Sequence, residues 1–319
     1  MPGSIVHDIG WSIDHLVQAR IKQQRFLYDH SAKDRTVPMD SPMILVDRAS
    51  FDQHFVERAL KLGQGRVQLR QNANVMDVVQ DKDGVTLVLK SGQSIRARYV
   101  IAADGASSRV ARAIGLYARA AGAGIDALVE TGPETFETER NRVTFNVHCV
   151  RDGYGWIFPK DDHLSCGVGI WRDPDGLVPA MDDFLARSLP PDDILHVTRL
   201  AHPVPVFTGH RQIATERVCL VGDAAHLVDP VLGEGIKYAI QSGQLAADVV
   251  AQLLQPHRVE PARPTGTDDS FSSVLSQFRD CFAYGHILRH TIGRQLNLIR
   301  LQDESFFTSP QTVYQAIIG

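Results

Sequence analysis

The spacing of apolar and polar residues predicts strands in the first part of the chain. Residues 17–28 alternate in a nearly regular way, and residues 43–46 form a short run that is apolar throughout. Alternation with a period of two is typical of a half-buried strand, and a short apolar run is typical of a buried one. We therefore predict one strand in each of these two segments.

A helical pattern follows the second predicted strand. Residues 50–62 come shortly after Arg48, and Ser50 is a suitable N-cap for a helix that starts there. Four apolar side chains of this segment share one helical face: Phe51, Phe55, Ala59 and Leu62. The spacing predicts an amphipathic helix.

Between residues 67 and 103 the pattern returns to strands. Apolar or alternating runs occupy residues 67–69, 73–79 and 85–89, and the last two are separated by the turn sequence DKDG. The chain then returns through residues 95–103, which end in an apolar stretch. This succession predicts a hairpin that leads into one buried parallel strand.

Further strands and two helical regions are expected in the second half. Three strand patterns, consistent with a second sheet, occupy residues 142–150, 154–159 and 164–171. Residues 218–221 form a short buried run, and residues 236–254 are typical of an alanine-rich helix. A segment with three prolines at 255–269 indicates a linker before a final helical region at 271–301.

Composition narrows the class of protein. A chain of 319 residues with 44% hydrophobic residues can bury a large core, and we expect a soluble globular protein. The net charge of -4 comes from 33 basic and 37 acidic residues mixed along the chain, without the basic stripe that nucleic acid requires. We therefore expect no nucleic-acid partner.

Cysteine usage and hydropathy indicate the compartment. Cys149, Cys166, Cys219 and Cys281 stand far apart without a C-x-x-C pair, and Cys219 lies in a strand pattern typical of a core. No apolar run approaches the roughly 18 residues of a membrane span, and the first residues lack a signal peptide. A reducing, cytoplasmic location fits best.

The first segment whose residues are suited to binding a ligand is YVIAADGASSRVA at residues 99–111. An apolar strand runs directly into Asp104 and Gly105 and then into a helix start. In open α/β sheets, ligands bind beyond the carboxyl ends of the strands, where glycine permits close approach and free helix N–H groups bind anions. An ordinary strand, turn and cap explains this segment equally well, so by itself it decides little.

The segment at residues 218–240 is more specific. An apolar strand ends in Gly222 and Asp223, and a loop with Pro230 and the sequence Gly233-Glu234-Gly235 precedes a helix. Asp223 is suited to accept hydrogen bonds from a polyol such as the ribityl chain of a flavin. The glycine turn frees the N–H group of Ile236 to face negative charge, which the helix dipole also favours. A purely structural turn is the weaker interpretation.

These residues resemble the flavoproteins built on the aromatic hydroxylase fold. GDAAHLVDPVLGEGIKYAIQSGQLAA is similar to their second FAD motif, and its GEGIKYAIQSG ending is similar to that of geranylgeranyl reductases. DGASSR resembles the motif near the FAD pyrophosphate, and RASFD resembles the segment whose arginine reaches FAD. The resemblance implies flavin contacts from Arg48, Asp104, Asp223, Gly235 and Ile236. The other cofactor-binding residues expected in the same segments are Gly105, Gly222, Pro230, Gly233 and Glu234. The resemblance places Ala73, more loosely, near the adenosine half.

An aromatic motif supports the same family. GYGWIFP at residues 153–159 resembles the Tyr-x-Trp-x-Phe-Pro motif of the reductases, whose aromatic residues line an apolar cavity beside the flavin. Tyr154, Trp156 and Phe158 alternate along a strand, so they project from one face and could form a wall for a long hydrocarbon. We expect these three and Pro159 to contact substrate. Without the resemblance, a core role would be favoured.

The opening unit of the family is missing from this sequence. Members begin with a strand, a G-x-G-x-x-G turn and a helix that hold the FAD pyrophosphate, and this chain starts with a sequence that resembles the family well after that unit. We therefore expect an N-terminally shortened product or a misassigned start.

The resemblance implies an α/β fold. It consists of a Rossmann-like FAD-binding domain without its first βαβ unit, interleaved with an antiparallel substrate sheet and C-terminal helices. The expected boundaries assign residues 1–135 to the remainder of the FAD domain with inserted substrate-domain strands, and residues 136–210 to the β-sheet substrate domain. Residues 211–255 hold the second FAD motif and its helix, and residues 256–319 a linker and a C-terminal helical region.

The resemblance also implies the reaction. The complete enzyme would bind FAD, take electrons from NAD(P)H or a ferredoxin, and reduce C=C bonds of a prenyl-chain lipid, with peripheral membrane contact. His148, His163, Cys166 and His226 are available as proton donors, but none is assigned as catalytic, and no metal is expected.

Two rival hypotheses stay open at this point. One is an FAD-dependent monooxygenase or halogenase, against which Lys237 and the pair Ser242-Gly243 count, since hydroxylases usually carry Asn and Asp there. The other is an inactive remnant or binding protein.

Overall fold

The computed structural model describes most of the chain up to residue 254. The described residues are 1, 5–27, 34–120, 122–147, 149–171, 174–208, 212–230 and 232–254. The predicted linker at 255–269, the predicted helical region at 271–301, His148 and Cys281 lie outside them.

The chain divides into two compact units. Unit 1 contains Met1–Gln71 and Ala121–Val204, and unit 2 contains Asn72–Ala120 and the described part of Pro205–Arg300. Each unit is therefore assembled from separate stretches of sequence. The predicted boundaries at 135 and 210 imply that one part of the chain binds cofactor and another binds substrate. This division of roles stays a prediction.

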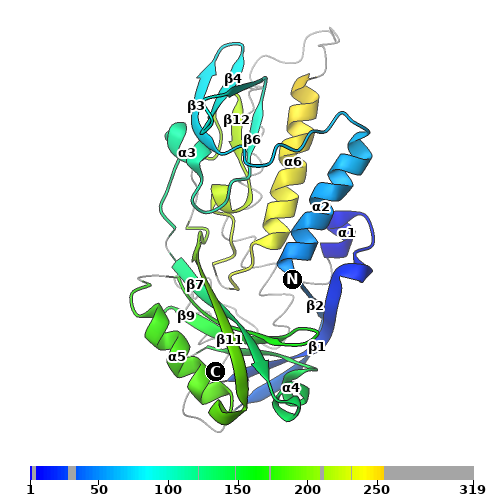
Figure 1. Ribbon diagram of the computed structural model, residues 1–319, viewed down its shortest axis with the longest axis vertical. Coiled ribbons are helices and arrows are strands. Elements are labelled where there is room, and N and C mark those ends of the chain that lie inside the picture. Colours follow the sequence, from blue (N-terminus) through cyan, green and yellow to red (C-terminus); the bar gives the residue numbers. More distant parts are fainter. Residues whose placement is uncertain are drawn as a thin grey trace, which may run out of the picture. The chain divides into compact units, whose positions relative to one another are not determined.

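Unit 1 is built on a seven-stranded sheet with the order β11-β7-β10-β9-β8-β1-β2. Figure 1 labels β11, β7, β9, β1 and β2 of this sheet. The strands are β1 (Val17–Leu27), β2 (Arg35–Val46), β7 (Gly122–Thr131), β8 (Val143–Asn146), β9 (Gly153–Pro159), β10 (Leu164–Ile170) and β11 (Ile194–Val204). Neighbours are antiparallel except β1 and β8, which pair in parallel. The five strands predicted in these regions are confirmed, and they all belong to this one sheet.

One face of this sheet is covered by α5 (Leu177–Ser188). Met181 and Phe184 of this helix are almost fully buried and pack in a core cluster with Ile157 of β9 and Val168 of β10. Gly155 makes close packing possible, because a Cβ atom there would lie 2.6 Å from the Phe184 ring. The residues of β9 and β10 that alternate with these belong to the opposite face.

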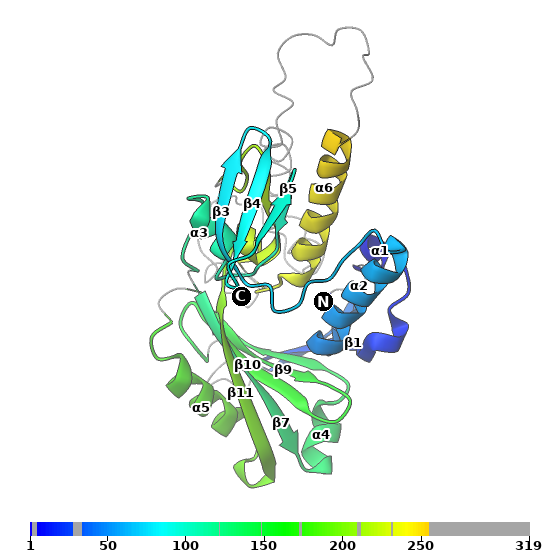
Figure 2. The ribbon, with the colours of Figure 1, turned by 45° about the horizontal axis from the view of Figure 1, so that its top comes forward.

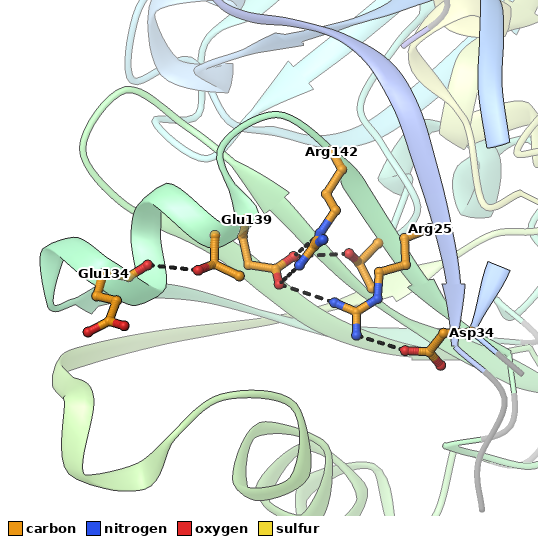
Figure 3. A network of polar contacts seen from close by, with 7 residues as sticks. Arg25, Asp34, Glu134, Glu139 and Arg142 are labelled. Carbon is orange, nitrogen blue, oxygen red and sulfur yellow. Dashed lines mark hydrogen bonds and ion pairs between the residues drawn. The ribbon is translucent and has the colours of Figure 1, made fainter. Parts of the chain in front are cut away.

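A buried carboxylate fastens the short helix α4 (Pro133–Glu139) to the sheet (Figure 3). Glu139 accepts from Arg142 at 2.7 Å, from Arg25 of β1 at 3.3 Å and from the hydroxyl of Thr144 in β8 at 3.1 Å. A buried charge is tolerated when it is paired and hydrogen-bonded in this way. Arg25 also pairs with Asp34 at 2.9 Å.

Helix α2 (Arg48–Gly63) begins three residues earlier than its predicted N-cap suggested. The N-cap is Asp47, whose carboxylate accepts from the backbone N–H and the hydroxyl of Ser50 at 2.8 Å each. These bonds lower the pKa of Asp47. The predicted apolar face is correct at Phe51 and Phe55, whose rings lie 4.9 Å apart, but Ala59 and Leu62 are exposed.

Unit 2 contains two small sheets (Figure 2). β3 (Val75–Asp81), β4 (Gly84–Leu89) and β5 (Ser94–Ala97) form an antiparallel sheet, and β6 (Val100–Ala102) pairs in parallel with β12 (Val218–Leu220). The predicted hairpin and buried parallel strand are thus confirmed. Helix α6 (Ile236–Leu254) has the predicted bounds.

Several elements were not predicted or were predicted wrongly. Strands β7 and β11 and helices α4 and α5 were not expected. Residues 67–69 form no strand and Val67 and Leu69 are exposed, while residues 95–103 split between β5 and β6. The remaining short elements are α1 (Ile5–Ile9), η1 (Asp14–Leu16), α3 (Arg109–Ala113), η2 (Pro191–Asp193) and η3 (Gly222–Ala225).

The predicted α/β class with an antiparallel sheet is confirmed. Among the described helices, none combines the length and the apolar character that crossing a membrane requires.

Candidate functional site

Two aspartates follow the carboxyl ends of two paired parallel strands in unit 2. Asp104 comes two residues after β6, and Asp223 comes three residues after β12, in the short helix η3. Because parallel strands end at the same edge of a sheet, both acids lie at the edge where open α/β sheets bind ligands. The structure therefore brings together the two segments that the sequence singled out.

The loop between η3 and α6 returns to Asp223. A Cβ atom on Gly235 would lie 3.2 Å from the Asp223 Oδ1 atom and 3.1 Å from a methyl carbon of Val228. Gly235 directly precedes Ile236, the first residue of α6, so the carboxylate lies close to the helix start. Within the described residues, the Ile236 backbone N–H has no backbone acceptor, as expected at a helix N-terminus.

A tight turn shapes this loop. The Asp229 N–H donates to the Glu234 carbonyl at 2.9 Å, and the Gly233 N–H donates to the Asp229 carbonyl at 3.0 Å. Gly233 has a φ of 64°, in the left-handed region that favours glycine. Pro230, within this turn, is buried. The carboxyl group of Glu234 is also buried, and burial raises its pKa.

Helix α6 is anchored to the loop after β12 by a serine. Ser242 accepts from the Gly222 N–H at 3.0 Å and donates to the Tyr238 carbonyl at 2.6 Å. Gly222 has a φ of 52°, and a Cβ atom there would lie 3.0 Å from that of Ala239. This close packing of helix against loop fixes where α6 begins relative to Asp223.

Asp104 is engaged locally. Its carboxylate accepts from the hydroxyl of Ser108 at 2.6 Å and from the backbone N–H groups of Arg109 and Val110 at 2.8 and 3.1 Å. These contacts hold the turn that contains Gly105 and cap the start of α3. A direct contact of Asp104 or Gly105 with a cofactor stays a prediction.

His226 has a structural role. It adopts a left-handed backbone conformation, is buried, and its Nε2 atom lies 3.0 Å from the Ala118 carbonyl oxygen. This contact gives His226, which the sequence offered as one available proton donor, a hydrogen-bonding role in the loop.

Two predicted FAD contacts lie away from strands. Arg48 is exposed in the first turn of α2 and pairs with Asp52 at 2.8 Å. Ala73 precedes β3 by two residues, so its predicted position inside a strand was wrong. Arg48 belongs to unit 1 and Ala73 to unit 2.

The predicted aromatic row is present on β9 of unit 1. The rings of Tyr154 and Trp156 are 6.0 Å apart, and those of Trp156 and Phe158 are 6.4 Å apart. Phe145 of β8 packs against both Tyr154 and Phe158. Pro159 alternates with Phe158 and so belongs to the opposite face, with Gly155 and Ile157. A substrate contact by Pro159 receives no support from this placement.

The strand beside the aromatic row carries small residues on the same face. Ser165, Gly167 and Gly169 of β10 pair with Phe158, Trp156 and Tyr154 respectively. This alternation of small residues was visible in the sequence LSCGVGI and could have revealed the space that the rings occupy. Sequence reasoning also missed Asp126 of β7, whose carboxylate accepts from the Trp156 indole N–H at 3.3 Å.

The loop at Asp223 fits the flavin end of FAD. Gly233 and Gly235 carry no side chains, and at Gly235 the missing Cβ atom lets the loop pack closely against Asp223 and Val228. Asp223 offers an acceptor for hydroxyl groups, and the start of α6 offers donors and a favourable dipole for negative charge. Across the part of the chain that the structure describes, no His, Cys, Asp and Glu cluster is suited to a metal ion.

Comparisons with known proteins agree with this arrangement. The FAD binding domain family matches residues 40–261. A digeranylgeranylglycerophospholipid reductase of Methanocaldococcus jannaschii is 27% identical over 241 residues, which cover 72% of this chain and 60% of that protein. A chloroplastic geranylgeranyl diphosphate reductase of Arabidopsis thaliana is 32% identical over 175 residues, covering 53% of this chain and 37% of that protein.

A solved structure shows the same fold. The geranylgeranyl bacteriochlorophyll reductase-like protein of Thermoplasma acidophilum superposes with a TM-score of 0.73 at 19% identity, covering 99% of this chain and 79% of that one. The resemblance to geranylgeranyl reductases is thus confirmed, although the chain spans only about 60% of the length of the Methanocaldococcus relative. From the match over residues 40–261, the chain belongs to the FAD binding domain family.

Proposed function

We propose that this protein is an FAD-dependent oxidoreductase that reduces C=C bonds in a geranylgeranyl or similar prenyl chain. The observation that carries the proposal is that Gly235, just before the start of α6, lies close to the Asp223 carboxylate. A Cβ atom on Gly235 would lie 3.2 Å from the Asp223 Oδ1 atom. The relatives' names, which specify geranylgeranyl substrates, support the choice of substrate class.

When bound, FAD supplies hydride chemistry at its ring system. In this proposal Asp223 accepts hydrogen bonds from ribityl hydroxyls, Gly233 presents bare backbone to the ring, and Gly235 keeps the loop close to Asp223. The Ile236 N–H and the dipole of α6 stabilise the negative charge of the reduced ring. Gly222, Pro230 and Glu234 shape this loop, while Arg48, Ala73, Asp104 and Gly105 are proposed contacts with the rest of FAD.

The aromatic row of unit 1 is proposed to receive the hydrocarbon. Tyr154, Trp156 and Phe158 offer a flat apolar surface, which suits a prenyl chain because it buries apolar area without demanding hydrogen bonds. NAD(P)H or a ferredoxin is the proposed electron donor. A lipid substrate would bring the protein into peripheral contact with a membrane.

Cofactor binding is tested first. The protein is purified, supplied with FAD and desalted, and its visible absorbance is compared with that of Gly235→Val and Gly243→Ala. Valine at 235 would collide with Asp223 and Val228, whereas a Cβ atom at Gly243 meets nothing within 4 Å. We expect flavin to be retained by the parent and by Gly243→Ala and lost by Gly235→Val. Equal retention by all three would contradict the proposed loop.

The reaction is tested next. The flavin-loaded protein is reduced with NADPH or dithionite under anaerobic conditions and incubated with geranylgeranyl diphosphate or a digeranylgeranyl lipid. We expect products heavier by two hydrogens for each bond reduced. Flavin binding without any such product, together with hydroxylation of an aromatic acid in air, would favour the monooxygenase instead.

A further inference from the structure

A single oxygen atom of Asp126 joins two side chains on the aromatic face of unit 1. Its Oδ1 atom accepts from the Trp156 indole N–H at 3.3 Å and from the Ser165 hydroxyl at 2.8 Å. The three residues come from three neighbouring strands, β7, β9 and β10. The indole therefore crosses the whole of β10 to reach its acceptor.

The strand register explains how the indole can cross. Trp156 pairs with Gly167, and Gly167 pairs with Asp126. A Cβ atom on Gly167 would lie 2.1 Å from Cζ2 and 2.4 Å from Cε2 of the indole. The ring thus lies against bare backbone, and no other residue type would leave it this space. Gly167 allows the indole ring to lie flat against β10, and the hydrogen bond to Asp126 orients the indole N–H toward β7.

A packing role alone does not account for an aspartate at this position. Asp126 is half-buried, its strand neighbour on the same face is Leu128, and its carboxylate interacts with the ammonium of Lys160. Partial burial of a carboxylate costs free energy that a leucine would not cost, and this cost is offset by the hydrogen bonds from Trp156 and Ser165 and by the charge of Lys160. The specific result here is one fixed orientation of the largest ring of the row.

We propose that Asp126, supported by Ser165, is a positioning residue that holds Trp156 flat and thereby shapes the surface that binds the substrate chain. The identity of that chain as a prenyl group rests on the proposed function. The orientation of the indole does not, so the two can be tested separately.

The orientation is tested by the indole N–H signals of the protein labelled with nitrogen-15 tryptophan. The chain has three tryptophans, and Trp156→Phe identifies the signal of interest. We expect Asp126→Ala to shift that signal and to increase its exchange with water, while Asp126→Asn, which keeps an acceptor oxygen, retains most of the parental signal. Asp183→Ala is the matched control, since Asp183 is exposed on α5 and pairs with Arg187. An unchanged Trp156 signal in Asp126→Ala would overturn the proposal.

The consequence for substrate is tested with the flavin-loaded enzyme. We expect Asp126→Ala to raise the KM for the prenyl substrate about five-fold, roughly the factor of one hydrogen bond, with unchanged flavin absorbance and recovery in Asp126→Asn. An unchanged KM despite a shifted indole signal would overturn the role in substrate binding. A parent protein that binds flavin but reduces no prenyl chain would overturn the proposed function, and the indole signals would still decide whether Asp126 positions Trp156.

Discussion

Ser242 accepts a hydrogen bond from the backbone N–H of Gly222, 3.0 Å away, and so joins helix α6 to the end of strand β12. Its hydroxyl proton is directed to the Tyr238 carbonyl within the same helix at 2.6 Å. Ser242 is buried, with 3% of its surface exposed. The hydroxyl therefore both accepts and donates a hydrogen bond. These two bonds explain why a serine occupies this helix position, although alanine is the better helix former.

The first prediction concerns this contact. Ser242→Ala leaves the Gly222 N–H buried without an acceptor, and we expect the free energy of unfolding to fall by about 1–3 kcal/mol. Urea denaturation followed by circular dichroism measures the change. Gly243→Ala, at the next position of the same helix, has open space and should be neutral or stabilising by about 0.5–1 kcal/mol. Equal stability of the parent and Ser242→Ala would show that another group replaces the hydroxyl.

The second prediction concerns the space beneath the indole. Gly167→Ala places a methyl group 2.1 Å from Trp156 and 2.6 Å from the Ile125 carbonyl oxygen, so the ring must move. We expect a loss of about 1–3 kcal/mol in unfolding free energy and a change in tryptophan fluorescence. Gly124→Ala is the matched control, because a Cβ atom there meets its nearest neighbours at 3.6 Å. Similar effects of both substitutions would mean that the collision is relieved without moving the indole.

Local patterns in the sequence predicted the elements around the loop at Asp223 well. Two short apolar runs form the strands before Asp104 and Asp223. A long helical stretch that follows Gly235 forms α6. Such signals depend on neighbours in the chain, so one sequence suffices to find them.

What could not be predicted depends on partners distant in sequence. β11 has an exposed burial pattern over most of its length, and its place in the sheet comes from pairing with β7. β1 joins β8 in parallel across more than a hundred residues, which no local pattern reveals. Asp126 lies in β7, a strand that was not predicted, and its role depends on a ring that reaches it across β10. Only the three-dimensional pairing discloses such residues.

The third prediction concerns thiol reactivity. Cys219 is fully buried, as its strand pattern predicted, and burial raises the pKa of its thiol to about 12. Burial also raises the pKa of Cys166, whereas Cys149 is only partly buried. Because the thiolate is the reactive form, we expect iodoacetamide to modify Cys149 in the native protein well before Cys166 or Cys219. Mass spectrometry of digested samples over time locates the label. Early labelling of Cys219 would indicate that its strand opens readily, and a sample labelled in urea controls for intrinsic reactivity.

The last prediction concerns a partly buried lysine at the end of the aromatic row. Lys160 lies two residues beyond Phe158, and its Nζ atom donates to the Val46 carbonyl at 2.7 Å. Burial lowers the pKa of Lys160 below its ordinary value of 10.5, and the nearby carboxylates of Asp126, Asp47 and Asp161 oppose this effect only in part. Keeping the ammonium charged in the folded protein therefore costs free energy at neutral pH.

The sign of the pH dependence follows from this lowered pKa. Between the pKa of Lys160 in the folded chain and 10.5, the unfolded chain binds more protons, so raising the pH through this window increases the contribution of Lys160 to stability. We expect the parent to gain unfolding free energy relative to Lys160→Met as the pH rises from neutral toward this value. Urea denaturation of both proteins at several pH values gives the difference, in which the titration of groups common to both cancels. A difference that stays constant or moves in favour of methionine would show that the ammonium of Lys160 is not penalised by burial.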